Sequence, residues 1–144
     1  MSACPAKGPP VAVELNHTVV LARDKRVSAE FLAEVLGLEV GAPFGPFLPV
    51  DTGNGVTLDY YDAEDTAFTP THYAFLVPDE EFDAMIDRLE RMRVPYFADP
   101  QHSDPGRINR LFGGRGAYFD DPSGHNMEII TRPYTRAPRP AAAP

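Results

Sequence analysis

The sequence has little cysteine, no long apolar run and a shortage of positive charge, and each shortage excludes a class of protein. Cys4 is the only cysteine, so no disulfide can form within the chain. No apolar stretch approaches the roughly 20 residues that a membrane span needs. Residues 1–10 lack the apolar segment of a signal peptide. We therefore expect a cytoplasmic protein with no membrane partner.

The charge balance argues against nucleic acid as a partner. The 144 residues carry a formal net charge of −8, and the sequence pI is about 4.8. Proteins that bind nucleic acid or anionic membranes usually present a basic surface instead. A local basic cluster at Arg107, Arg110 and Arg115 is compatible with a small anionic ligand. The length and the 43% of hydrophobic residues suit one compact domain or two very small fused modules.

Both ends of the chain are predicted to be disordered tails. Residues 1–11 and 134–144 are rich in proline and alanine, and such segments cannot bury enough apolar surface to offset the entropy of ordering. Between them we expect a first module over 12–62 and a second module over 70–133.

The first module reads as a strand, a helix and three short strands. Residues 13–22 are rich in β-branched and apolar side chains, which is typical of a strand. A helix is expected over 28–36, with Ser28 as its N-cap and Gly37 as its C-cap. Proline and glycine divide the rest of the module into strands that we expect near 39–44, 46–51 and 55–61.

The second module repeats this order. A strand over 72–77 precedes a helix that Asp79 is expected to cap, with apolar residues at helical spacing. Strands are expected near 94–98, 115–119 and 126–131, with a long loop over 99–114. His72 follows His17 by 55 residues at the same strand position. An internal repeat of this kind predicts an α+β fold of two βαβββ modules that form a curved mixed sheet around a cleft.

His17, His72 and Glu128 are the candidate metal ligands. Each histidine alone reads more readily as a buried structural residue, but the two occupy equivalent places in the repeat. Strand alternation turns Glu128 away from Met127 and Ile129, towards the concave side, where a carboxylate needs a cation or a donor. Pairing with Arg132 is the structural alternative. Two imidazoles and one carboxylate suit Fe²⁺, Mn²⁺, Zn²⁺, Co²⁺ or Ni²⁺.

The segment Gly113–Glu128 (GGRGAYFDDPSGHNME) is the most specific stretch of the chain. It resembles the end of the second module in the vicinal-oxygen-chelate superfamily, which includes glyoxalases, bleomycin-resistance proteins and extradiol dioxygenases. There an aromatic strand, an Asp-Pro-x-Gly turn and a metal-binding Glu follow one another. The resemblance covers roughly 13–133 and implies a two-module fold with His17, His72 and Glu128 as the ligands of one divalent metal ion.

Within that superfamily the stretch is most similar to the extradiol-dioxygenase signature. Tyr118 matches a tyrosine that helps to hold the substrate hydroxyl, whereas Arg110 stands where that family has a histidine. Arg110 is a candidate for binding a carboxylate or another anion. His102 lies in the 99–114 loop and is a candidate acid or base, because such loops often cover active sites. His125, in the turn before the last strand, is expected to face solvent.

Two other relatives set limits on the chemistry. Glyoxalase I uses a fourth ligand, a Glu on the last strand of the first module, and the matching position here is read as Thr57, with Asp59 two residues on. Fosfomycin-resistance transferases share the ligand set but usually carry Thr or Cys two residues after the first His, where this chain has Val19.

Two functions remain open at this point. One is a metal-dependent enzyme, dioxygenase-like or glyoxalase-like (a lyase or isomerase), acting on a small oxygenated or aromatic metabolite. The other is a drug- or metabolite-binding protein of the bleomycin-resistance type, which sequesters its ligand without catalysis. The resemblance also implies a homodimer in which His17 comes from one subunit and His72 with Glu128 from the other.

Overall fold

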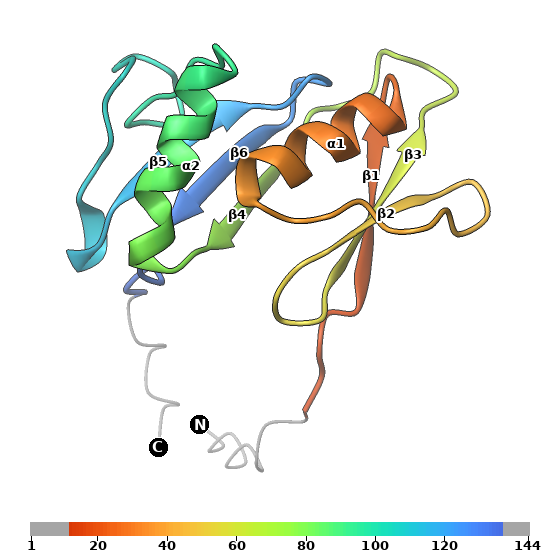
Figure 1. The fold of residues 1–144 in the computed structure, drawn as a ribbon, viewed down its shortest axis with the longest axis horizontal. Coiled ribbons are helices and arrows are strands. Elements are labelled where there is room, and N and C mark those ends of the chain that lie inside the picture. The colour runs from red at the N-terminus through yellow and green to blue at the C-terminus, as the bar shows by residue number, and fades with distance from the viewer. Residues whose placement is uncertain (1–11, 137–144) are drawn as a thin grey trace, which may run out of the picture.

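The computed structural model describes residues 12–136, which fold as two modules lying side by side (Figure 1). The predicted tail at 1–11 and residues 137–144 of the predicted tail at 134–144 lie outside the described residues. Module one contains β1 (His17–Ala22), α1 (Lys25–Leu36), β2 (Leu48–Asp51) and β3 (Thr57–Asp62). Module two contains β4 (His72–Leu76), α2 (Asp79–Arg91), the short 3-10 turn η1 (Leu111–Gly113), β5 (Gly116–Asp120) and β6 (Asn126–Ile130).

The two modules share one topology. In module one β1 pairs in parallel with β3, which pairs antiparallel with β2, giving the order β1-β3-β2. Module two has the equivalent order β4-β6-β5, with the same strand directions. In each module the first strand starts at a histidine and the central strand is the last in sequence. The predicted repeat and the α+β class are therefore confirmed.

The prediction of three further strands per module is wrong for one strand in each. Residues 39–44 form only two isolated bridges, Val40 with Val50 and Phe44 with Phe47. Residues 94–98 are reduced to Phe97, whose N–H and C=O pair with the backbone of Tyr118 at 2.8 Å each. Pro43 and Pro95 lie within these stretches, and a proline has no N–H to donate to a ladder.

Neither predicted N-cap residue occupies the N-cap position of its helix. Asp24 caps α1, its carboxylate accepting from the N–H groups of Arg26 and Val27, whereas Ser28 lies buried inside the helix. Pro78 occupies the N-cap position of α2, and Asp79 is the first helical residue. The Asp79 carboxylate accepts instead from Nε of Arg115 at 3.1 Å. Gly37 ends α1 with a φ of 70°, as its place after the helix predicts.

The core lies between the sheets and the two helices, which cover one side of the molecule (Figure 1). It contains alternate residues of each strand, such as Val20, Ala22, Met127 and Ile129, and the apolar face of α2. The other residues of β1 and β4 face away from the helices. Among these, Val19 and Leu21 remain exposed at 43% and 37%, so this face of β1 is apolar and uncovered within one chain.

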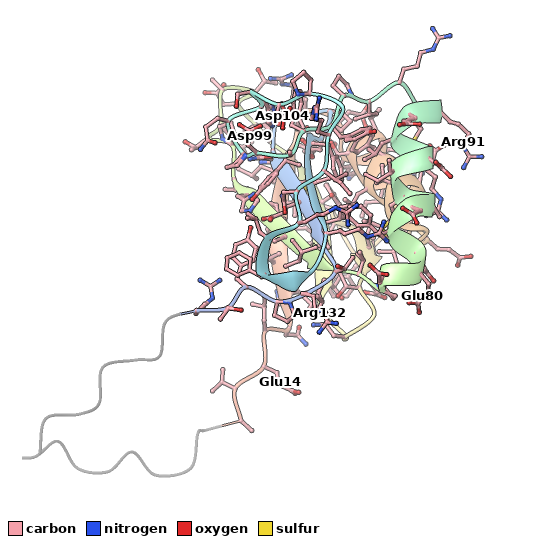
Figure 2. The ribbon with its side chains drawn as sticks, turned by 90° about the vertical axis from the view of Figure 1, so that its left-hand side faces the viewer. Glu14, Glu80, Arg91, Asp99, Asp104 and Arg132 are labelled. Carbon is pink, nitrogen blue, oxygen red and sulfur yellow. The ribbon has the colours of Figure 1, made fainter. Side chains whose placement is uncertain are left out.

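The chain ends of the described part leave the body near one end of the sheets. Figure 2 shows Glu14 on an extended segment that projects from the lower end of the body, Arg132 also towards this end, and Asp99 and Asp104 at the opposite end. Neither helix of residues 12–136 is long and apolar enough to cross a membrane.

Candidate metal centre

His72 and Glu128 meet on the face of module two that points away from α2. Glu128 lies opposite Ala74 of β4 and Tyr118 of β5, and His72 starts β4 two residues before Ala74. The side chain of Glu128 is only 2% exposed, whereas that of His72 is 47% exposed. The imidazole Nε2 lies 3.0 Å from Oε1 of the carboxylate. Arg132 is not the partner of Glu128 here, in contrast to the structural alternative.

The hydrogen bonds of His72 indicate which of its two ring nitrogens carries the proton and which has a free lone pair. Its Nδ1 lies 2.9 Å from the carbonyl oxygen of Asn126. A carbonyl only accepts, so Nδ1 carries the proton and donates. In the neutral ring Nε2 is then an acceptor, and it faces another acceptor, the carboxylate of Glu128. Two acceptors at 3.0 Å need either a proton or a metal cation between them.

Tyr118 and Tyr134 cover the second oxygen of this carboxylate. The hydroxyl of Tyr134 donates to Oε2 of Glu128, and it lies 3.0 Å from the hydroxyl of Tyr118. The ring of Tyr118 also stacks on His72, with centroids 6.0 Å apart. Burial, followed by the hydrogen bond with Tyr134, raises the pKa of Tyr118 above its ordinary value. Burial and the hydrogen bond to Glu128 raise the pKa of Tyr134 as well, so both hydroxyls stay protonated and able to donate.

Sequence reasoning missed Tyr134, because it assigned residues 134–144 to a tail. The available signal was its being the one aromatic residue in a C-terminal stretch otherwise made of proline, alanine, threonine and arginine. In the structure its ring stacks on Phe112 of η1, with centroids 4.6 Å apart. The start of the predicted tail is thus packed over Glu128.

His17 lies apart from the His72–Glu128 pair within one chain. It is exposed at the start of β1, and its Nδ1 lies 2.8 Å from the side-chain oxygen of Asn16. An amide oxygen accepts, so Nδ1 donates and Nε2 is left with a free lone pair, as in His72. Within residues 12–136 of a single chain, no three His, Cys, Asp or Glu side chains come together as metal donors.

The strand register corrects the reading of module one. Glu128 pairs with Ala74, two residues after His72, and Asp59 pairs with Val19, two residues after His17. Asp59, not Thr57, is therefore the residue of module one that corresponds to Glu128. It is 8% exposed. The sequence alone could not give this register, because it depends on how β1 and β3 pair.

Arg110 and His102 lie near the two ends of β5, since Asn109 pairs with Gly116 and His102 contacts Asp120. Arg110 is exposed and lines a hollow of about 320 Å³ with Gly113, Gly114, Arg115 and Arg132, and neither His72 nor Glu128 contributes to that lining. His102 stacks on Phe97, with ring centroids 4.1 Å apart, and its Nε2 lies 3.6 Å from Asp120. Asp120 pairs with Asn126, which pairs with His72. His102 therefore stands at the edge of the sheet face that carries the pair.

The prediction that His125 faces solvent is wrong, since it is 1% exposed between the modules. Its Nδ1 accepts from the N–H of Thr71 at 3.0 Å, and its Nε2 donates to the carbonyl of Leu21 at 2.6 Å. The Asp-Pro-Ser-Gly turn before it also contacts module one, where Ser123 accepts from the N–H of Arg23 and lies 3.0 Å from the hydroxyl of Ser28. This turn joins the modules, which is why its histidine is buried.

Comparison with known proteins tests the resemblance read from the sequence. Residues 14–129 match the family described as the Glyoxalase/Bleomycin resistance protein/Dioxygenase superfamily. The solved structure of a protein named oxidase ChaP-H2 is 56% identical, with a TM-score of 0.83 over 86% of this chain and 97% of that one.

Two curated relatives are transferases. Glutathione transferase FosA of Serratia marcescens is 30% identical over 80% of this chain and 78% of its own length. Metallothiol transferase FosB of Lysinibacillus sphaericus is 26% identical over 81% of each. All three relatives are named as enzymes, which supports a metal-dependent enzyme in general. The chain belongs to the glyoxalase/bleomycin resistance protein/dioxygenase superfamily.

Proposed function

We propose that this chain is a divalent-metal-dependent enzyme that oxidises a small oxygenated aromatic metabolite. His72 and Glu128 of one protomer and the partner's His17 hold the metal. The observation that carries the proposal is the approach of Nε2 of His72 to Oε1 of Glu128 at 3.0 Å, with Nδ1 already donating to a carbonyl. A cation between these two acceptors satisfies both.

The geometry of the pair fits one metal ion. Ligand atoms bound at about 2.0–2.2 Å and meeting at a right angle lie about 3 Å apart, which is the separation of Nε2 and Oε1 here. The carbonyl of Asn126 holds the imidazole in the tautomer that a metal requires. Two imidazoles and one carboxylate leave coordination positions open. When bound, such a cation polarises neighbouring oxygens of a substrate and stabilises the charge that develops on them.

The surface around His17 supports a site completed by two protomers. His17 offers a free Nε2 but has no carboxylate in hydrogen-bonding contact within its own module. Three apolar residues near it in the sequence are exposed, with Val13 at 83%, Leu15 at 68% and Val19 at 43%. An uncovered apolar strip next to an incomplete ligand set is what an interface between copies would bury.

The remaining side chains of the sheet face would orient the substrate and move protons. Tyr118 stacks on His72 and keeps a hydroxyl proton close to the centre. Asp120, Asn126 and His72 lie in one cross-strand row, so the Cα atoms of Asp120 and His72 are about 10 Å apart. His102, beside Asp120, would then act as acid or base on the far part of a bound substrate. Arg110 would bind an anionic group only outside this row.

The choice of oxidation rests on the relative named oxidase ChaP-H2, at 56% identity over nearly its whole length. Transfer of glutathione is the second candidate, because FosA bears that name and is 30% identical. Val19, in place of the Thr or Cys usual two residues after the first histidine of fosfomycin-resistance transferases, argues against this chemistry.

The test begins with the full chain purified without chelator. We expect close to one metal ion per chain by elemental analysis, and consumption of oxygen with some members of a panel of hydroxylated aromatic compounds. His72→Ala should abolish both. The proposal would be overturned if the wild-type chain held well below one metal ion and His72→Ala left that metal content unchanged. Tight binding of such compounds by metal-free protein, without turnover, would favour a sequestering protein instead.

A further inference from the structure

The segment that follows β6 turns back over the carboxylate of Glu128. Tyr134 lies four residues beyond the end of β6, and its hydroxyl donates to Oε2 of Glu128. Its ring is held by Phe112, stacked at 4.6 Å, and the guanidinium of Arg136 lies 5.9 Å from its centroid. Contacts on the ring and on the hydroxyl therefore fix Tyr134 in place.

The two oxygens of Glu128 have different partners. Oε1 lies 3.0 Å from His72, whereas Oε2 accepts from Tyr134. A phenol has one proton to donate, and Tyr134 uses it on Glu128, so the 3.0 Å contact between the two tyrosines is a donation from Tyr118 to Tyr134. The chain of donors thus runs from Tyr118 through Tyr134 to Oε2.

This arrangement restricts how Glu128 can bind a cation. The last torsion of a glutamate side chain is broad, so an unsupported carboxylate can rotate and bind through one or both oxygens. The hydrogen bond from Tyr134 occupies Oε2 without touching Oε1. It is compatible with a cation between Oε1 and Nε2 of His72, and it opposes rotation of the carboxylate away from that position.

We propose that Tyr134 is a positioning residue that holds Oε2 of Glu128 and so presents Oε1 alone beside His72. This inference rests on the proposed function, because it assigns Tyr134 a role towards the metal that His72 and Glu128 would bind. Groups that hydrogen-bond to metal ligands typically change metal affinity by about 10–100-fold when they are removed.

The test is Tyr134→Phe in the full chain, with Zn²⁺ binding measured by calorimetry and the electronic absorption spectrum of the Co²⁺ form. Phenylalanine keeps the stack on Phe112 and removes only the hydroxyl. We expect Zn²⁺ affinity to fall about 10–100-fold and the Co²⁺ spectrum to change. Tyr96→Phe is the matched control, because the hydroxyl of Tyr96 donates to the exposed Glu90 at 2.8 Å. It should leave both readouts unchanged.

A double variant separates action through Glu128 from a general loss of packing. If Tyr134 acts through the carboxylate, adding Tyr134→Phe to Glu128→Gln should weaken Zn²⁺ binding no further. The inference would be overturned if Tyr134→Phe had the affinity and spectrum of the wild type. It would also be overturned if Tyr134→Phe weakened Zn²⁺ binding equally in the wild-type chain and in Glu128→Gln. In both cases the proposed function stands. Absence of Zn²⁺ and Co²⁺ binding by the wild-type chain would instead overturn the proposed function.

Discussion

Module one and module two place a histidine at the same point of the same topology, yet they give it different surroundings. His17 and His72 each start the first strand of their module and each donate through Nδ1 to a neighbouring oxygen. Across the sheet, module two supplies a buried Glu128 that reaches His72, whereas module one supplies Asp59, which is one methylene shorter. No hydrogen bond joins Asp59 to His17 among the described residues. In the proposed metal site, module two would thus contribute two ligands and module one a single imidazole.

The two histidines also differ in how far other side chains cover the sheet face beside them. Tyr118 and Tyr134 cover Glu128, while β1 exposes Val19 and Leu21 on the face of His17. In the proposed metal site, the part that module two supplies is already arranged within one chain. Under the same proposal, the part that module one supplies comes from a second copy.

The largest expected effect is on Zn²⁺ affinity when the carboxylate of Glu128, rather than that of Asp59, is replaced. Glu128→Gln keeps the shape of the side chain and removes its charge, so Zn²⁺ affinity measured by calorimetry should fall by more than about 100-fold, beyond the loss typical of supporting groups. Asp59→Asn, the equivalent change in module one, should lower the affinity by less than about tenfold. Equal losses in the two variants would show that both modules supply a carboxylate ligand.

A mixed dimer sharpens the comparison of the two histidines. Chains carrying His17→Ala and chains carrying Glu128→Gln should each bind Zn²⁺ weakly as homodimers. When the two are co-expressed with different tags and purified as a heterodimer, one complete site should reappear, because intact His17 from one chain meets intact His72 and Glu128 of the other. A heterodimer no better than its parents would show that the site is not shared between protomers.

The contact between the modules can be broken at His125. His125→Phe removes the acceptor of the Thr71 N–H and the donor to the Leu21 carbonyl, in two part-buried hydrogen bonds. Since a buried group left unpaired costs about 1–3 kcal/mol and a partly exposed one costs less, we expect a total loss of about 1–3 kcal/mol in the free energy of unfolding, measured with urea. His102→Phe, in the 99–114 loop, should cost less than about 1 kcal/mol. Similar losses for both would contradict the joining role of His125.

Local features of the fold and of the candidate site could be predicted from the sequence, whereas contacts between distant segments could not. The repeat and the facing of Glu128 followed from strand alternation and equivalent spacing, which are local properties of the sequence. Tyr134 and His125 could not be placed, because their contacts come from how separate segments pack. The identification of Asp59 needed the pairing of β1 with β3, which the sequence does not encode locally.

Errors in element boundaries have equally specific causes. Asp24 and Ser28 are both good helix caps, and Asp24 prevails because β1 ends only two residues before it. The sequence predicts Asp79 as the cap of α2, but its carboxylate accepts a hydrogen bond from Nε of Arg115 instead. Pro43 and Pro95 lie in stretches rich in apolar residues, and neither has the backbone N–H that a regular strand needs.

The smallest expected effect is a pH dependence at the junction between the modules. Burial raises the pKa of Asp121, despite backbone N–H groups of His125 and Ser123 that oppose it. The folded chain then holds this proton more tightly than the unfolded chain. The contribution of Asp121 to stability is fully present below the ordinary pKa of about 3.8 and is lost as pH rises through the folded-state pKa.

Asp121→Asn should remove this loss. The amide keeps an oxygen for the two backbone donors and offers an N–H near the buried Tyr60 hydroxyl, which has no hydrogen-bond partner within residues 12–136. We expect a gain of about 1 kcal/mol at pH 7, with no gain near pH 4, from urea unfolding at several pH values. A variant less stable than wild type at pH 7 would contradict this account of the junction.

The most direct test of the shared metal centre is anomalous diffraction from crystals of the full chain grown with its metal. The account predicts one anomalous peak per protomer, bounded by Nε2 of His72, Oε1 of Glu128 and the partner's His17. A peak elsewhere, or a peak at His72 and Glu128 with His17 of both protomers far from it, would contradict it.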